Sequence, residues 1–188
     1  MKRVALIVAV VVVIAFALML RHGFSAHDEP TAIERVIARS MRHWATPSDL
    51  RHRTNPMRLT PEALAEGRAH FADHCAVCHG NDGKGTSGMG KQMYPRTPDM
   101  TLAATQGLAD GELFSIIENG VRLTGMPGFG NGTAESGAGS WALVHFIRHL
   151  PKITPQEIAE MEKLNPKSPE EWKQMEDEAA FLGGDTIR

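Results

Sequence analysis

The sequence predicts an all-α protein, because helix-start signals recur along the chain and apolar residues follow several of them at helical spacing. Each signal is a Thr or Ser cap followed by proline, by glutamate three places on, or by both, and the caps are Thr31, Thr60, Thr154 and Ser168. The 188 residues leave room for one compact domain with extensions. The aromatic content of 6% is low, so a bound apolar group would help to fill the core.

Residues 1–22 are predicted to be a membrane anchor or a signal segment. Two basic residues precede an uninterrupted apolar run over residues 4–20, which as a helix would span roughly 25 Å, slightly less than the hydrocarbon core of a bilayer. A signal peptide needs small residues at the first and third positions before its cleavage site, and cleavage after Ala26 would put an aromatic residue at the third. The run therefore favours a retained single-pass anchor with a cytoplasmic N-terminus. A cleaved signal peptide is the alternative.

Residues 23–59 are predicted to be a connector that contains one amphipathic helix. Thr31 and Glu34 form a capping-box pattern. Apolar residues then recur at helical spacing: Ile33, Val36, Ile37, Met41 and Trp44. Arginines fall largely on other positions, and a basic amphipathic helix beside a membrane anchor can lie on the lipid surface. We instead expect the stripe to pack on the domain that follows or on a partner subunit.

Cys75, Cys78 and His79 form a CxxCH pattern, which is typical of covalent haem attachment. Two thiols three residues apart can each form a thioether with one vinyl group of a haem c, and His79 would then be the axial nitrogen ligand of the iron. A disulfide or a redox CxxC site is the alternative. A zinc site would need further ligands at suitable spacing, and the chain has no other cysteine and no second Cys/His pair of that kind. The pattern therefore predicts one covalently bound haem.

Residues 60–150 resemble the class I cytochromes c. Gly67, Phe71 and Cys75 follow one another at intervals of four, an arrangement similar to the first helix of that family. The resemblance implies that a C-terminal helix crosses the first helix at the small residue, and residues 141–150 match that helix. A glycine inside a helix costs about 1 kcal/mol relative to alanine, so close packing is the natural reason for the glycine.

The resemblance also assigns the loops after the CxxCH pattern. Residues 80–85 are rich in glycine and tolerate positive φ, and they are implied to turn the chain away beneath the haem. A proline carbonyl is implied to accept the N–H of His79, which fixes the tautomer of the imidazole. Pro95 and Pro98 are both candidates for that acceptor.

Met126 is the residue that the resemblance implies as the second axial ligand. A short helix is predicted from a cap at Asp110 to Gly120, and a Thr-Gly-Met-Pro sequence follows it that is similar to the sixth-ligand loop of many small bacterial members of the family. A thioether is a soft ligand that suits Fe(II). The rival methionines lie closer in sequence to the histidine of the motif, and they are Met89, Met93 and Met100.

Residues 151–188 are predicted to be an acidic extension with two helices that wraps the domain or docks a partner. Its first helix follows Thr154 and its second follows Ser168. The second helix would carry an apolar stripe of Trp172, Met175, Ala179 and Leu182.

Together these features predict an electron carrier rather than an enzyme. One haem would cycle between Fe(II) and Fe(III), with His79 and Met126 as axial ligands, at the periplasmic face of a bacterial inner membrane. The expected partners are redox proteins of a respiratory chain or the other subunits of a membrane redox complex. No sequence feature suggests nucleic-acid binding or a catalytic constellation. A haem enzyme or gas sensor, with a displaceable sixth ligand, is the alternative.

Overall fold

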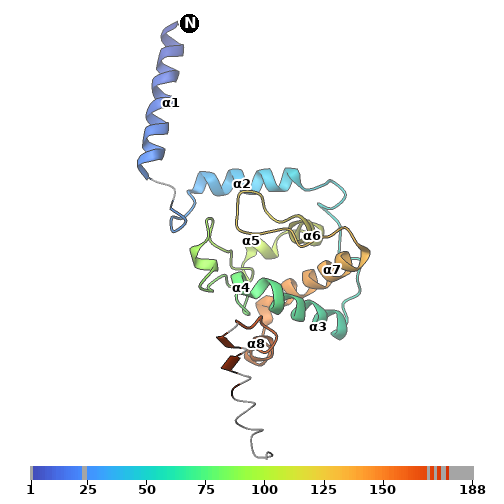
Figure 1. Ribbon diagram of the computed structural model, residues 1–188. Coiled ribbons are helices and arrows are strands. Elements are labelled where there is room, and N and C mark those ends of the chain that lie inside the picture. Colours follow the sequence, from blue (N-terminus) through green and yellow to red (C-terminus); the bar gives the residue numbers. More distant parts are fainter. Residues whose placement is uncertain (1, 23–24, 169, 172, 175–176, 178–188) are drawn as a thin grey trace, which may run out of the picture.

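The computed structural model describes residues 2–22, 25–168, 170–171, 173–174 and 177. Over these residues the chain forms helices and loops and no strand, which confirms the predicted all-α class (Figure 1). The α-helices are α1 (Lys2–His22), α2 (Ala32–Ala45), α3 (Pro61–His70), α4 (Ala76–His79), α5 (Ala103–Gln106), α6 (Asp110–Asn119), α7 (Ala134–His149) and α8 (Pro155–Glu162). The shorter elements are the π-helix η1 (Phe71–Cys75) and the 3-10 helices η2 (Gly90–Gln92) and η3 (Leu150–Lys152).

α1 projects away from the rest of the chain, and its apolar side chains are exposed, among them Val4, Ile14 and Phe16 (Figure 1). The apolar run that follows the two basic residues is thus helical. Within the described ranges, no helix combines the length and the hydropathy that a membrane crossing requires. The anchor over residues 1–22 therefore stays a prediction.

α2 begins at the predicted capping box. The Glu34 N–H donates to the Thr31 hydroxyl oxygen at 3.3 Å, and the Thr31 N–H donates to a Glu34 carboxylate oxygen at 2.6 Å. The expectation that the apolar stripe of this helix packs on the following domain is wrong, because all five of its side chains are exposed. A polar side chain makes the contact instead, since His43 Nδ1 lies 2.8 Å from a carboxylate oxygen of Glu112 in α6. The domain surface beside α2 carries the charged Glu112, so the polar side of the helix, and not the apolar side, contacts the domain.

α3 and α7 cross at Gly67, as the resemblance implies. A Cβ on residue 67 would overlap the backbone carbonyl of Ala142, so only glycine lets the two backbones approach this closely. Phe71 and Phe146 pack together beside the crossing with their ring centroids 5.1 Å apart, and both are fully buried. The core extends from this crossing to side chains of α6, α7, η3 and α8, which include Leu113, Ile117, Val144, Leu150 and Met161.

The prediction that Asp110 caps α6 is wrong. The residue at the cap position is Ala109, whose N–H donates to the Glu112 carboxylate at 2.9 Å. Asp110 is the first residue inside the helix. Gly120 ends the helix as predicted, with a φ of 67° that glycine adopts without strain.

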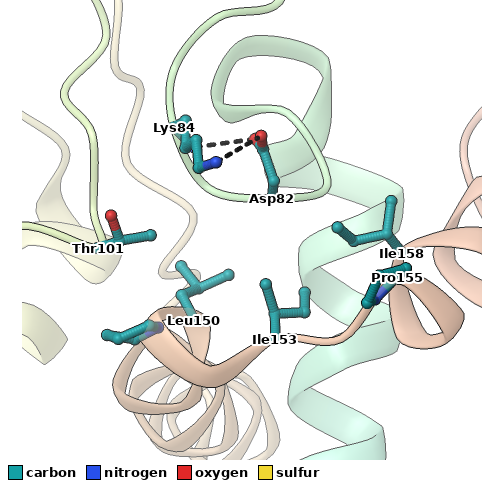
Figure 2. Close-up of a pocket in the computed structure, with 8 residues that line it drawn as sticks. Asp82, Lys84, Thr101, Leu150, Ile153, Pro155 and Ile158 are labelled. Carbon is teal, nitrogen blue, oxygen red and sulfur yellow. Dashed lines mark hydrogen bonds and ion pairs between the residues drawn. The ribbon is translucent and has the colours of Figure 1, made fainter.

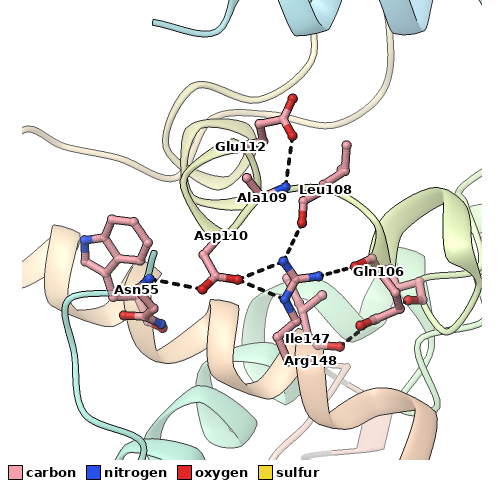
Figure 3. Close-up of polar contacts among 10 residues, drawn as sticks. Asn55, Gln106, Leu108, Ala109, Asp110, Glu112, Ile147 and Arg148 are labelled. Atoms are coloured by element: carbon pink, nitrogen blue, oxygen red, sulfur yellow. Dashed lines mark hydrogen bonds and ion pairs between the residues drawn. The ribbon is translucent and has the colours of Figure 1, made fainter. Parts of the chain in front are cut away.

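The Asp110 carboxylate instead ties α6 to α7 and to the connector. It accepts two hydrogen bonds from the Arg148 guanidinium, at 2.8 and 2.9 Å, and one from the Asn55 N–H at 3.0 Å (Figure 3). The same guanidinium donates to the carbonyls of Gln106 and Leu108. A capping carboxylate accepts N–H groups of the first turn of its own helix. The partners of Asp110 lie in other segments, so its carboxylate does not cap α6.

α8 packs the first part of the extension on the domain. Thr154 caps it with the predicted box, and a Glu157 carboxylate oxygen also lies 2.8 Å from His149 Nε2. Met161 near its end is fully buried in the core. The capping bonds predicted at Ser168 are present as well, because its N–H donates to the Glu171 carboxylate at 2.7 Å. The apolar stripe expected in the second helix lies outside the described residues: Trp172, Met175, Ala179 and Leu182.

Candidate functional site

The CxxCH residues lie on one continuous helical stretch. α3 passes into η1 and then into α4, so that Cys75 ends η1 while Cys78 and His79 lie in α4. η1 is a π-helical turn, in which the Ala76 N–H bonds to the Phe71 carbonyl five residues back. Single π-helical turns inside α-helices frequently occur at functional sites. Local helix geometry therefore presents two thiols and an imidazole within five residues.

Cys75 and Cys78 are both free thiols. Burial raises the pKa of Cys75 to about 12, with a smaller contribution from the neighbouring Cys78, and burial also raises the pKa of Cys78. A redox CxxC site needs the opposite effect, because the attacking thiol must have a lowered pKa to be present as thiolate. The environment of the pair therefore disfavours thiol–disulfide exchange.

His79 is buried, with only 7% of the residue exposed. Burial lowers its pKa to about 4, and the backbone carbonyl of Pro98 opposes that shift with a smaller effect. The imidazole is therefore neutral at neutral pH, and one ring nitrogen carries a lone pair that can bind a metal. Of the two candidate prolines, Pro98 is the one whose carbonyl acts on the ring.

The His79 Nδ1 atom is buried and has no hydrogen-bond partner at normal distance and angle within the described residues. Buried polar atoms are nearly always paired, so such an atom needs an explanation. The Pro98 carbonyl is close enough to raise the pKa of the ring, so it is the acceptor that Nδ1–H would use. That bond would leave Nε2 as the nitrogen available to an iron ion.

The loop after His79 brings Pro98 to the ring. Three of its glycines have φ of 68–72°, which confirms the predicted use of residues that tolerate positive φ. A Cβ on one of them, Gly85, would overlap the Thr97 carbonyl. The Gly85 N–H also donates to the His79 carbonyl at 2.7 Å. The same glycine is thus held between the motif helix and the residue that precedes Pro98.

Ser87 supports the motif from a position that sequence reasoning missed. Its hydroxyl lies 2.8 Å from the carbonyl oxygens of both Val77 and Cys78, to which it donates, and it accepts the Gly90 N–H at 2.9 Å. It thereby satisfies carbonyls at the end of α4 that have no partner inside the helix. No local pattern marks this serine, because the contact depends on how the loop folds back.

Met126 lies partly buried in the loop between α6 and α7. Its carbonyl accepts the Val121 N–H at 3.1 Å, and its own N–H donates to the Thr124 hydroxyl oxygen at 3.1 Å. Gly120 closes the loop with positive φ, and a Cβ there would lie 2.6 Å from the Met126 carbonyl oxygen. The backbone on either side of Met126 is therefore fixed, and its role as an iron ligand stays a prediction.

The structure separates the rival methionines. Met100 is 7% exposed and belongs to the core, whereas Met89 is 52% exposed. Met93 lies against the Met126 loop, because a Cβ on Gly125 would be 2.8 Å from the Met93 Sδ atom. The Met93 thioether thus lies beside the residue that precedes Met126 in the chain, which spacing alone did not indicate.

A small pocket lies where the loop after His79 meets η3 and α8 (Figure 2). Apolar side chains form most of its wall: Leu150, Pro151, Ile153, Pro155 and Ile158. Asp82 and Lys84 lie at its polar side and pair with each other at 3.9 Å. These two charges offset each other, and none of the residues that line the pocket belongs to the CxxCH motif or to the Met126 loop.

The donor set at the motif fits haem c. Among the described residues, no group of three or more His, Cys, Asp or Glu side chains is placed to hold a metal ion, so a zinc site at the two cysteines lacks further ligands. Two free thiols and one buried, neutral imidazole are the groups that covalent haem attachment requires.

One family of known proteins matches the residues that form this site. The model of the family described as cytochrome C oxidase, cbb3-type, subunit III matches residues 62–147. The matched segment begins in α3, includes the CxxCH motif and the Met126 loop, and ends in α7, while α1, α2 and α8 lie outside it. No curated protein matches the chain.

Proposed function

We propose that this chain, in which residues 62–147 form a c-type cytochrome domain, transfers single electrons through one haem c held by Cys75, Cys78, His79 and Met126. Haem-based electron transfer is the general function of such a domain. The observation that carries the proposal is the pairing of two free thiols with a buried, neutral imidazole on one helical stretch.

Each residue has a separate task in this proposal. Cys75 and Cys78 would form thioethers with the two vinyl groups, which prevents the cofactor from dissociating. His79 would bind the iron through the nitrogen opposite Pro98, and the Pro98 carbonyl would fix the ring orientation. Met126 would supply a soft sulfur ligand. When bound, the haem supplies a reversible Fe(II)/Fe(III) couple, whose potential a thioether ligand raises.

The partner is proposed from the matched family, whose description is that of a subunit of a cbb3-type cytochrome c oxidase. A subunit of that kind carries electrons to the other subunits of its complex. We therefore place this chain in a respiratory redox complex rather than among enzymes that act alone. A haem enzyme or gas sensor would require a sixth ligand that leaves readily.

The location is proposed from the N-terminal segment. α1 is apolar over residues 4–20, lacks acidic residues in its first turn, and exposes its apolar side chains. Burial in lipid would remove that exposed surface from water. We place residues 1–22 in a bacterial inner membrane as a single-pass anchor, with the haem domain in the periplasm.

The electron-carrier proposal is tested on the full-length protein with its haem. We expect one haem per chain, a one-electron redox titration, a low-spin ferrous spectrum and slow binding of CO. Rapid CO binding together with turnover of peroxide in the unaltered protein would contradict the carrier function and support a haem enzyme or sensor.

The membrane proposal has its own test. The protein should remain with the membranes through a high-salt wash, begin at or near residue 1, and co-purify with oxidase subunits after mild solubilisation. A soluble periplasmic form that begins between residues 24 and 28 would show that the segment is a signal peptide.

A further inference from the structure

One face of α2 is apolar and exposed. We call it the α2 apolar face, and its residues, with their exposed fractions, are Ile33 (72%), Val36 (64%), Ile37 (53%), Met41 (62%) and Trp44 (71%). None of the residues of this helix is buried. A row of five large apolar side chains along one helix is a contiguous patch rather than scattered exposure, and such patches mark interaction sites.

Contacts on other sides of α2 hold this face outward. His43 Nδ1 lies 2.8 Å from the Glu112 carboxylate, and Glu34 accepts a hydrogen bond from the Tyr94 hydroxyl at 3.2 Å. The Arg42 side chain is partly buried near Glu112, and burial lowers the pKa of its guanidinium. Polar groups of α2 already contact the domain. A rotation of the helix that turned the apolar face inward would break these contacts.

A short segment between the two helices places α2 close to the end of α1. Nine residues, 23–31, join the two helices and can span at most about 30 Å when fully extended. Figure 1 shows α2 on the side of the domain from which α1 projects. This segment also contacts the domain, since Arg96 pairs with Glu29 at 3.3 Å. A membrane that contains α1 therefore lies on the same side of the domain as α2.

Charge favours a lipid surface over a purely apolar partner. Residues 21–60 contain seven arginines against four acidic residues. Arg35 and Arg39 lie on α2 itself and are exposed, and within the described part of the chain neither forms an ion pair. A helix with arginines on its polar side and Trp, Ile and Met on the other has the composition of helices that lie in the headgroup region of anionic bilayers.

We propose that the α2 apolar face lies in the headgroup–acyl boundary of an anionic bilayer and holds the haem domain in a fixed orientation on the membrane. The proposal rests on the membrane location proposed above. α2 would then be sandwiched between lipid on its apolar face and the domain at His43 and Glu34. The anchor alone would only tether the domain, whereas a second contact beside it restricts rotation.

The test measures the depth of α2 in vesicles. Full-length protein with its haem is reconstituted into phosphatidylcholine vesicles with and without phosphatidylglycerol. A spin label is attached through Val36→Cys on the α2 apolar face, or through Arg35→Cys as the matched control. We expect the label at residue 36 to be accessible to oxygen and shielded from a water-soluble nickel chelate, the label at 35 to show the reverse, and the contrast to increase with phosphatidylglycerol.

Two results would overturn the proposal while leaving the anchor intact. Nickel-chelate access at residue 36 in vesicles that contain the protein would show that water covers the face. Shielding of residue 36 from both reagents would show that protein, such as a second copy or another subunit, covers it.

Flotation of the vesicles separates the anchor from α2. The double variant Val36→Glu/Ile37→Glu should still float with both kinds of vesicle but lose the depth signal, measured at a label on Met41→Cys. If the unaltered protein floats only with phosphatidylglycerol and the double variant does not float, α2 binds lipid and the anchor proposal fails. If the unaltered protein floats with neither, both proposals fail.

Discussion

Gly67 of α3 lies against the backbone carbonyl of Ala142 in α7, in a contact that leaves no space for a Cβ atom. The fully buried Phe146 lies on the same side, with its Cβ 3.1 Å from the position that a Cβ on residue 67 would take. Because α3 leads directly into the CxxCH motif, this crossing determines where the motif lies relative to α7. The stability of the site and that of the helix pair are therefore coupled.

Gly67→Ala should destabilise the protein, although alanine favours helix. Forcing a methyl group against a backbone carbonyl costs up to about 3 kcal/mol, and the carbonyl oxygen would overlap the new Cβ, so the cost should exceed the gain of about 1 kcal/mol in helix propensity. Thermal unfolding followed by circular dichroism checks this. Gly137→Ala in α7 is the matched control, because nothing lies within 4 Å of its added Cβ, and it should raise the melting temperature. Equal effects of the two substitutions would show that the crossing is not close.

Haem should remain on the unaltered chain after denaturation and acid extraction, because thioether bonds do not break under those conditions. Cys75→Ala/Cys78→Ala should lose the haem to the organic phase or fail to retain it. Haem absorbance of the denatured band measures the outcome, with each single variant showing the contribution of one bond. Complete extraction from the unaltered protein would contradict covalent attachment.

Met126→Ala should open the sixth coordination position, so that CO binds rapidly and the iron becomes high-spin or water-bound. It should also lower the reduction potential, because Fe(II) loses its soft ligand. Met126→His should keep six-coordination but lower the potential. Met93→Ala is the informative comparison, since Met93 lies beside the same loop, and Met89→Ala is an exposed control. An unchanged spectrum in Met126→Ala, combined with rapid CO binding in Met93→Ala, would identify Met93 as the axial ligand in place of Met126.

Arg148→Ala should destabilise the protein by about 2 kcal/mol, because it removes the donor to the carbonyls of Gln106 and Leu108 and two of the three hydrogen bonds to the Asp110 carboxylate. Arg148→Lys should recover only part of this loss, since an ammonium group lacks the planar fork that reaches all three. Urea unfolding at neutral pH measures both. Arg122→Ala, at an exposed position, should change stability by less than about 0.5 kcal/mol.

Protonation of Glu157 at low pH should destabilise α8. Burial raises the pKa of this carboxyl, but hydrogen bonds from Thr154 and His149 outweigh burial and leave it below the ordinary value of 4.5. A depressed carboxyl pKa stabilises the fold above the ordinary pKa, and that contribution is lost as the pH falls through the folded-state value. The protection factors of the amides in α8, which compare the observed exchange with the intrinsic rate at the same pH, should therefore fall as the pH drops below about 4.5.

Glu157→Gln should remove this acid dependence and make α8 exchange faster at neutral pH. Glu135→Gln, at an exposed position in the first turn of α7, is the control and should leave the exchange of α8 unchanged. Acid dependence that persists in Glu157→Gln would assign it to another group.

Those features that depend on neighbours in sequence could be predicted from the sequence. The CxxCH pattern places two thiols and an imidazole within five residues, so its arrangement follows from one helical turn. The caps at Thr31 and Thr154 are also local, because each bond joins residues three apart. The close helix crossing at Gly67 could also be predicted, because a glycine inside a helix lowers its stability and close packing is the natural reason to keep one there.

Only the tertiary structure decided the contacts between distant segments. It selected Pro98 over Pro95 at His79, and it turned the Asp110 carboxylate to Arg148 instead of to its own helix. It also left the apolar side of α2 exposed, because Glu112 in α6 pairs with His43 on another side of that helix. Periodicity shows that a helix has two faces, but which face meets the domain depends on the charges that folding brings opposite to it.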